Sequence, residues 1–148
     1  MAIEPATKTQ IVRKLLQRTP DELQKLGFNY VRSETEESET TGASTSFVHE
    51  AKDKGVVVDI SFNALGGDEF IIVVIERSDG KNMVANDFIK LHRLGSDEMF
   101  ELSSYSGGFE SQLQVCAQTI VSTITKHMKD ILTGQSWEEV PIDWGPYR

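Results

Sequence analysis

The three histidines are the first residues of this sequence that could do chemistry, as metal ligands or as proton acceptors. They are His49, His92 and His127, and they lie in a predicted strand, a predicted short helix and a predicted long helix. The spacings typical of zinc sites do not occur, since there is no His-Glu-x-x-His or His-x-His and no cysteine close to a histidine. We expect three ordinary surface or half-buried histidines and no metal site, unless the fold brings them together.

Nucleophiles and phosphate-binding loops are the next candidates. Cys116 is the single cysteine, which excludes an intrachain disulfide, and its place on an apolar helix stripe predicts a buried thiol with a raised pKa. No serine lies in Gly-x-Ser-x-Gly or Ser-x-x-Lys. Neither Gly66-Gly67 nor Gly107-Gly108 is followed by the spacing of a nucleotide-binding loop. The sequence therefore predicts no nucleophile and no cofactor.

Neighbouring carboxylates could in principle act as general acid and general base. Glu36/Glu37 and Glu138/Glu139 are such pairs, but adjacent exposed glutamates have little reason for the burial that tunes a pKa. We expect these groups to be solvated acids, and we expect the protein not to be an enzyme.

Acidic residues instead form clusters that fit a binding surface. One cluster runs from Glu34 to Glu39, others lie at Asp68/Glu69 and Asp97/Glu98/Glu101, and the last is Glu138/Glu139/Asp143 in the tail, beside two tryptophans. Aromatic residues within an acidic rim are typical of protein interfaces, although each tryptophan could simply seal one end of the core. The candidate partner-binding residues are Glu34, Glu36, Glu37, Glu39, Asp68, Glu69, Trp137, Glu138, Glu139, Asp143 and Trp144.

Composition and charge narrow the class of protein. The 148 residues match the size of one domain, here 1–148 with loop-like ends at about 1–6 and 135–148, and 39% apolar content fits a folded chain. A formal charge of -8 disfavours nucleic acid as a partner and favours basic proteins. The longest apolar run, Phe70 to Ile75, is too short to cross a membrane. We expect a cytoplasmic protein, either a monomer or a homodimer.

Helix signals open the chain. "TKTQIVRKLLQR" has apolar residues at helical spacing. In "TPDELQKLGF" we expect Thr19 to cap a second helix in a Thr-x-x-Glu capping box with Glu22, and Gly27 to end that helix in the left-handed conformation. These two segments predict a broken helical hairpin or one kinked helix that leads into a sheet.

Strand signals occupy the middle of the chain. Strands are predicted at 28–31, 46–51, 55–64 and 69–77, with Val58, Ile60 and Phe62 on the buried face of the third. Short polar connections favour an antiparallel meander of about four to six strands over a parallel array. The stretch "RSETEESETTGASTSF", residues 32–47, reads as a long mobile hairpin loop with partly strand-like arms.

The last third predicts helix. Residues 85–95 fit a short helix and residues 98–105 a further strand. After Gly107-Gly108 one long helix is expected to lie across the sheet and to end at Gly134. The apolar stripe of this helix consists of Phe109, Leu113, Cys116, Ile120, Val121, Ile124, Met128 and Ile131. The fold class is therefore α+β: a meander with helices before it and a long helix packed on it.

Two fragments carry a resemblance to a known family. These are "LQKLGFNYV", with Leu26-Gly27-Phe28 leading into the meander, and "MKDILTGQSWEEV", with Ile131-Leu132-x-Gly134 at a helix end before an aromatic residue. In layout and in these fragments the chain resembles bacterial immunity proteins of polymorphic and contact-dependent growth inhibition toxin systems. The resemblance implies tight binding of one cognate toxin domain, often a basic nuclease, in the cytosol of the producing cell, without catalytic residues.

A small acidic secretion chaperone is the alternative to an immunity protein. A chaperone would need apolar grooves for an unfolded client and a helix-mediated dimer, whereas an inhibitor would need acids on one rigid patch. A third class, a small enzyme, would require His49, His92, His127 or Cys116 to converge with carboxylates in a pocket.

Overall fold

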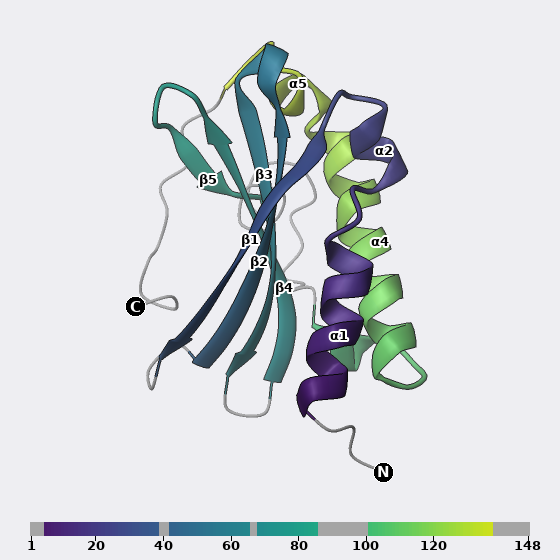
Figure 1. Cartoon of the computed structure of the whole chain (residues 1–148). Helices are drawn as coiled ribbons and strands as arrows, with labels where there is room; N and C mark the ends of the chain where they lie inside the picture. The colour runs from purple at the N-terminus through teal and green to yellow at the C-terminus, as the bar shows by residue number, and fades with distance from the viewer. Residues whose placement is uncertain (1–4, 39–41, 66–67, 86–100, 138–148) are drawn as a thin grey trace.

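The structure is a computed structural model that describes residues 5–38, 42–65, 68–85 and 101–137. An antiparallel sheet forms one layer, and helices cover one of its faces (Figure 1). Within these residues the order is two helices, five strands and two further helices, which confirms the expected α+β class and the meander. The candidate site lies on the sheet.

The N-terminal helices are α1 (Pro5–Leu16) and α2 (Asp21–Gln24). Helix α1 begins at Pro5, so the expected loop-like start is too long by two residues. Proline is favoured at the first helical position because its missing N–H needs no partner there. Gly27 has φ +94 and the Phe28 N–H donates to the Leu23 carbonyl at 3.0 Å, which confirms the left-handed helix end.

The capping box predicted at α2 is wrong. Pro20 occupies the N-cap position, and no side chain caps the helix. The Thr19 hydroxyl lies instead 2.8 Å from Nδ1 of His49 on the sheet. A buried histidine nitrogen needs a partner more than an exposed helix end does, because water can satisfy the latter.

The sheet consists of β1 (Asn29–Ser38), β2 (Gly42–Ala51), β3 (Val56–Leu65), β4 (Asp68–Arg77) and β5 (Asn82–Val84), in that order. A short 3-10 turn, η1 (Lys52–Lys54), joins β2 to β3. All pairs are antiparallel, and the register aligns Phe47 with Ile60 and Ile60 with Val73. These three residues share the face that the helices cover.

Residues 32–47 do not form the long loop that their composition predicts. Strand β1 continues to Ser38 and β2 starts at Gly42, with continuous pairing from Arg32↔Val48 to Ser38↔Gly42. Threonine is a good strand residue, and Thr35 pairs with Thr45 across the two strands. Cross-strand pairing therefore outweighs the polar composition.

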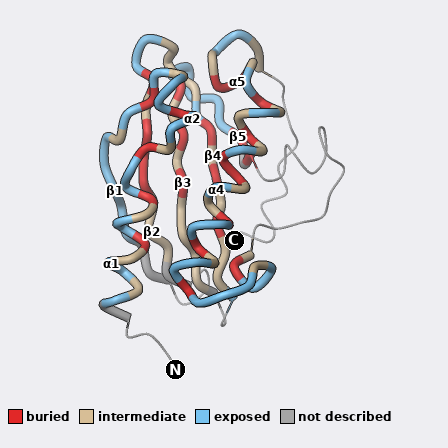
Figure 2. The backbone as a smooth tube through the Cα atoms, turned by 90° about the vertical axis from the view of Figure 1, so that its right-hand side faces the viewer, coloured by how far each residue is buried: buried red, intermediate tan, exposed pale blue. Residues whose placement is uncertain are grey.

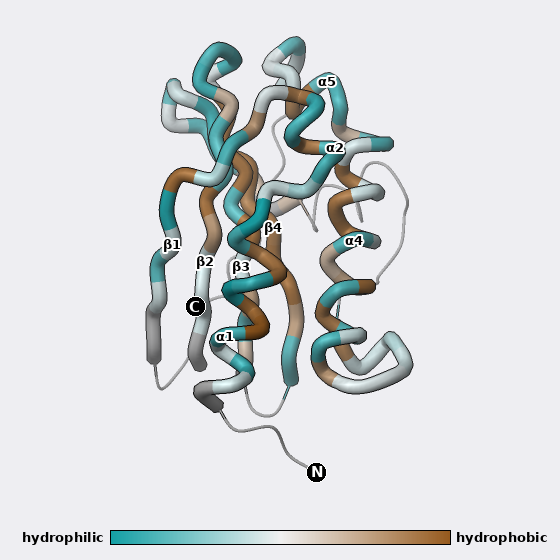
Figure 3. Tube along the Cα trace, turned by 45° about the vertical axis from the view of Figure 1, so that its right-hand side comes forward, coloured by the Kyte–Doolittle hydropathy of each residue, from teal (hydrophilic) through white to brown (hydrophobic). Residues whose placement is uncertain are grey.

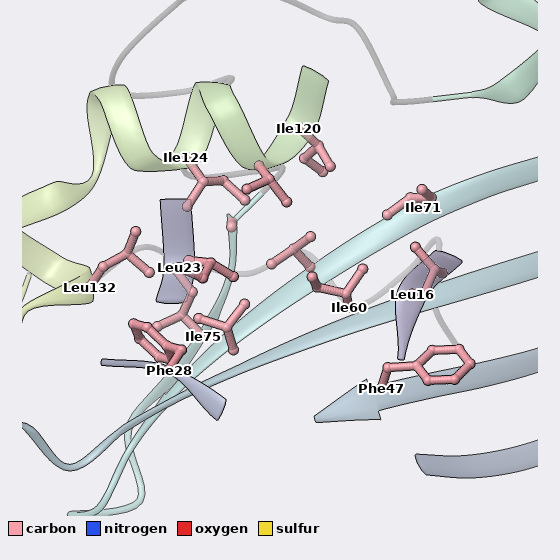
Figure 4. Close-up of a cluster of buried hydrophobic side chains, with 14 of the residues drawn as sticks. Leu16, Leu23, Phe28, Phe47, Ile60, Ile71, Ile75, Ile120, Ile124 and Leu132 are labelled. Carbon is pink, nitrogen blue, oxygen red and sulfur yellow. The ribbon is translucent and has the colours of Figure 1, made fainter. Parts of the chain in front are cut away.

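The core lies between the sheet and the helices. Figure 4 shows side chains from α1, α2 and the C-terminal helices meeting those of β2, β3 and β4. Along β4 buried and half-buried residues alternate (Figure 2), so one face of this apolar strand is covered and the other is partly open. Fully buried residues of this core include Leu23, Phe28, Phe47, Ile60, Ile71, Ile75, Leu113, Ile120 and Ile124.

The C-terminal helix is interrupted. Helix α4 (Phe109–His127) ends at Met128, which has φ -128, and α5 (Lys129–Leu132) follows. The hydroxyls of Thr119, Thr123 and Thr125 donate to carbonyls four residues earlier, and such bonds compete with the helix ladder and bend helices.

The apolar stripe of the predicted long helix is confirmed, because all eight of its residues are buried. Gly134 has φ +75 after α5, as its predicted role at a helix end requires. The strand predicted at 98–105 is wrong where it is described, since one bridge, Phe70↔Glu101, precedes a 3-10 turn, η3 (Leu102–Ser104). The short helix predicted at 85–95 lies almost entirely outside the described residues.

Candidate functional site

His49 serves the fold and carries no open site. It is fully buried on β2, which corrects the expected surface or half-buried position. Its Nε2 lies 3.1 Å from the Leu16 carbonyl, which can only accept, so Nε2–H donates there and Nδ1 accepts from Thr19. Burial lowers the pKa of His49 below its usual value of 6.5. The imidazole therefore stays neutral and ties the end of α1 to the sheet.

Cys116 and the remaining histidines do not assemble a reactive centre in the described chain. Cys116 is buried, and burial raises the pKa of its thiol to about 12, as its place on the stripe predicts. His127 is half-buried at the end of α4, and His92 lies outside the described residues. Across residues 5–38, 42–65, 68–85 and 101–137 no three His, Cys, Asp or Glu side chains are grouped so as to hold a metal ion.

Carboxylates gather on the face of the sheet opposite the helices. Strand alternation places Asp59 between Val48 of β2 and Val74 of β4, away from the row of Phe47, Ile60 and Val73. The same alternation puts further acids from all four long strands on this face. We call it the acidic sheet face, defined by Glu34, Glu50, Asp59, Asp68 and Glu76.

Asp59 lies at the centre of the acidic sheet face, and the ionised form of its carboxyl group is electrostatically unfavourable there. Partial burial, followed by the negative charges of Glu76 and Glu34, raises the pKa of its carboxyl group from 3.8 to about 6. A hydrogen bond from Ser46 and the charge of Arg32 oppose that shift. One oxygen, Oδ1, is buried and has no hydrogen-bond partner among the described residues. At neutral pH the Asp59 carboxyl group is therefore ionised against the repulsion of Glu76 and Glu34.

The glutamates that the sequence analysis singled out between residues 34 and 39 belong in part to β1, at one margin of the sheet. Glu34 is exposed on β1, and its Oε1 is 3.0 Å from Nε of Arg32. Glu36 and Glu37 follow on the same strand, in register with Ser44 and Ala43. Glu39 lies outside the described residues. The structure thus brings Glu34 together with Asp59, which the sequence cluster did not include.

Asp68 and Glu69 do not form a joint acidic patch. As neighbours on β4 they point to opposite faces. Asp68 is exposed, whereas Glu69 Oε2 lies 2.9 Å from Nζ of Lys8 on α1. That lysine also lies 4.8 Å from the centre of the Phe109 ring. Glu69 therefore joins the helix layer to the sheet.

Trp137 packs against the core. It is half-buried, and the Arg77 guanidinium carbon lies 5.6 Å from its ring centroid. This contact fits the alternative in which the tryptophan seals one end of the core. The other candidates of the tail, Glu138, Glu139, Asp143 and Trp144, lie outside the described residues.

A groove of about 560 Å³ lies on the helix side, between α1, the start of α2 and α4. Its apolar lining includes Leu15, Leu16, Ile60, Ala117 and Val121. Its polar lining includes Lys14, Arg18, Asp21, Glu22, Gln114 and Gln118. The groove thus combines a small apolar patch with polar groups of both charges.

Three members of the acidic sheet face were missed from the sequence: Glu50, Asp59 and Glu76. They are isolated acids in strands, 9 and 17 positions apart along the chain, so a search for clusters in sequence passes over them. The available signal was the alternation in β3 that places Asp59, Ser61 and Asn63 on its wetter face. Its neighbours across the sheet follow only from the register of both hairpins.

The function of this chain has to be inferred from its own sequence and structure. No family model matches the sequence, and it matches no curated protein and no solved structure. Within the described part of the chain, no helix has the length and apolar character needed to span a membrane.

Proposed function

We propose that this chain is a non-catalytic binding protein, an immunity protein that neutralises a cognate bacterial toxin in the cytoplasm by binding and occluding it. The observation that carries the proposal is the acidic sheet face, where Glu34 and Glu76 oppose the ionisation of Asp59. The family resemblance at Leu26-Gly27-Phe28 and Ile131-Leu132-x-Gly134 supports the same proposal.

A basic toxin domain is the partner that this face suits. Cations of the partner would relieve the repulsion among the carboxylates, so part of the free energy of binding would come from charges already held in place. A nuclease has a basic groove for its nucleic acid substrate, and an acidic protein seated in that groove would block it. The sheet is a rigid support for such charges, since from Arg32 onward its register is continuous through four strands.

A secretion chaperone is the second candidate, and the groove between α1 and α4 is the observation in its favour. A chaperone of this kind would hold an unfolded client against apolar surface. Against it, Val31 and Val115 are the large apolar side chains that the described residues expose, and they lie far apart in the chain, on β1 and α4.

The test is growth rescue. The chain would be co-expressed in a bacterial host with the product of the open reading frame upstream of its gene, under separate promoters. We expect that product to arrest growth alone, the chain to restore growth, and the two to co-elute as a complex with equal amounts of each.

The test variant carries Glu34→Lys and Glu76→Lys on the acidic sheet face. Its matched control carries Glu22→Lys and Glu110→Lys, two exposed acids on the helix side. Both pairs change the net charge equally. Rescue that is weaker for the first pair supports the acidic sheet face. If the chain is instead a dimer that is needed for export of the upstream product, the chaperone is the correct function.

A further inference from the structure

In the part of the chain that the structure describes, strand β1 has a free edge. It spans ten residues, and the strand order places it at the margin of the sheet, with β2 as its neighbour (Figure 3). Alternate residues of an edge strand direct their backbone N–H and C=O groups away from the sheet. On that side β1 has no strand partner among the described residues. It therefore offers a row of backbone donors and acceptors to an added strand.

The two margins of the sheet differ in how they are protected. Strand β5 has three residues, and a short edge strand gives little template for pairing. Strand β1 is long and contains neither proline nor lysine, the residues that commonly block an edge. Its one irregularity is the register shift between Tyr30 and Arg32, and the register is continuous from Arg32 to Ser38. This later part is open to pairing.

Exposure and charge indicate which strand would fit. Residues 31–35 of β1 are exposed, shown pale blue in Figure 2, and Val31 at the register shift is 48% exposed. The strand sequence has three glutamates and one arginine, and Arg32 already lies within 3.0 Å of Glu34. Opposite charges on paired strands are stabilising. The complementary segment is therefore extended and basic.

We propose that β1 is a strand-addition site, at which an extended segment of the partner, with lysine or arginine at alternate positions, pairs with the free edge and enlarges the sheet by one strand. This rests on the proposed function and supplies its mode of contact. Backbone hydrogen bonds give affinity in such additions, and side chains select the partner. The exposed Glu34 of β1 would then pair with a partner cation, on the acidic sheet face.

The first test uses a synthetic peptide in which lysine alternates with valine. Its control has proline in place of each valine, so the charge is kept while strand pairing is lost. Amide hydrogen exchange of the whole chain would be measured at low salt. With the lysine-valine peptide at about ten times its Kd, we expect exchange of the edge amides of β1 to slow about tenfold. The lysine-proline peptide should leave them unchanged.

The second test blocks the edge itself. Ser33→Pro and Glu34→Pro change neighbouring residues, whose N–H groups point to opposite sides of β1. One proline therefore removes an edge donor, while the other breaks the ladder with β2 and lowers the Tm. The variant that keeps its Tm should lose the peptide-induced slowing. Glu34→Gln, which removes charge but keeps the N–H, should retain it.

Equal slowing by both peptides, slowing confined to other elements, or none with either peptide would overturn strand addition. So would growth rescue at full strength by the edge-blocking proline variant. These outcomes leave the proposed function standing, because rescue by the unaltered chain tests that function separately.

Discussion

At the scale of single residues, the carboxyl group of Asp59 opposes folding at neutral pH. Its pKa of about 6 in the folded chain lies above the ordinary 3.8. The folded state therefore binds the proton more tightly than the unfolded state does. The stability from this group is present below about pH 4 and is lost as the pH rises through 6. A carboxylate kept at such a cost fits a binding role, because functional groups often lower stability.

Asp59→Asn should therefore stabilise the protein at pH 7. With allowance for solvent screening we expect a gain of ~1 kcal/mol, or about 2–4 °C in Tm for a chain of this size. Thermal unfolding at pH 7 and at pH 4 would measure it, and the gain should shrink at the lower pH. An equal gain at both values would show that ionisation is not its cause.

His49 should give the opposite pH dependence. Its folded pKa is lowered by burial, so the unfolded state binds the proton more tightly, and stability should fall as the pH drops below 6.5. Because Asp59 acts in the other direction over an overlapping range, the comparison belongs in the Asp59→Asn background. In that background, His49→Gln should reduce the change in the free energy of unfolding between about pH 5 and pH 7. A slope that His49→Gln leaves unchanged would assign the acid sensitivity to other groups.

At the scale of elements, α4 is held by its buried stripe. Ile120 is fully buried between the helix and the sheet (Figure 4), whereas Ser122 on the same helix is exposed. Ile120→Asp would bury an unpaired carboxylate in an apolar core, and we expect it to abolish cooperative unfolding. Ser122→Asp, the matched control, should stay within about 0.5 kcal/mol of the wild type. Circular dichroism melts would distinguish them, and wild-type stability of Ile120→Asp would mean that α4 is not core.

The elements could be predicted where one face of the chain has to be buried. The alternation in β3 and the stripe of α4 each repeat with the period of their element, so the sequence predicts both the element and its buried side. Residues 32–47 lack such a pattern, because β1 at the margin buries little, and the prediction there was wrong. Thr19 failed as a cap for a different reason: its partner His49 is 30 residues away, beyond the reach of local rules.

The candidate site was predictable in part, for the same physical reason. Glu34 belongs to a cluster of glutamates in the sequence, so a search for acid clusters finds it. The link from Glu34 to Asp59 and Glu76 passes through three strand pairings, and a shift of one residue in any of them would turn its acids to the other face.

At the scale of the whole molecule, charge is distributed unequally between the two layers. The sequence of α1 has no acidic residue, and Lys8, Arg13, Lys14 and Arg18 lie in or directly after it. The acidic sheet face lies on the side of the sheet away from this helix (Figure 1). Such a separation orients an approaching basic protein toward the sheet before contact.

This orientation predicts a rate effect that depends on where charge is changed. Reversal of Glu34, Glu36, Glu37 and Glu39 to lysine should slow association with the basic partner at low salt, by about tenfold or more, without unfolding the protein. Stopped-flow mixing with the proposed toxin partner would measure the rate.

The control for the rate is reversal of four exposed acids elsewhere: Asp21, Glu22, Asp53 and Glu110. Both variants have the same net charge, so a loss of overall attraction would slow them equally, whereas steering toward the sheet would slow the first more. The difference should vanish at about 1 M salt, where the Debye length is only ~3 Å. Equal association rates for the two variants at low salt would show that the net charge of the protein, rather than the position of the reversed acids, determines the rate.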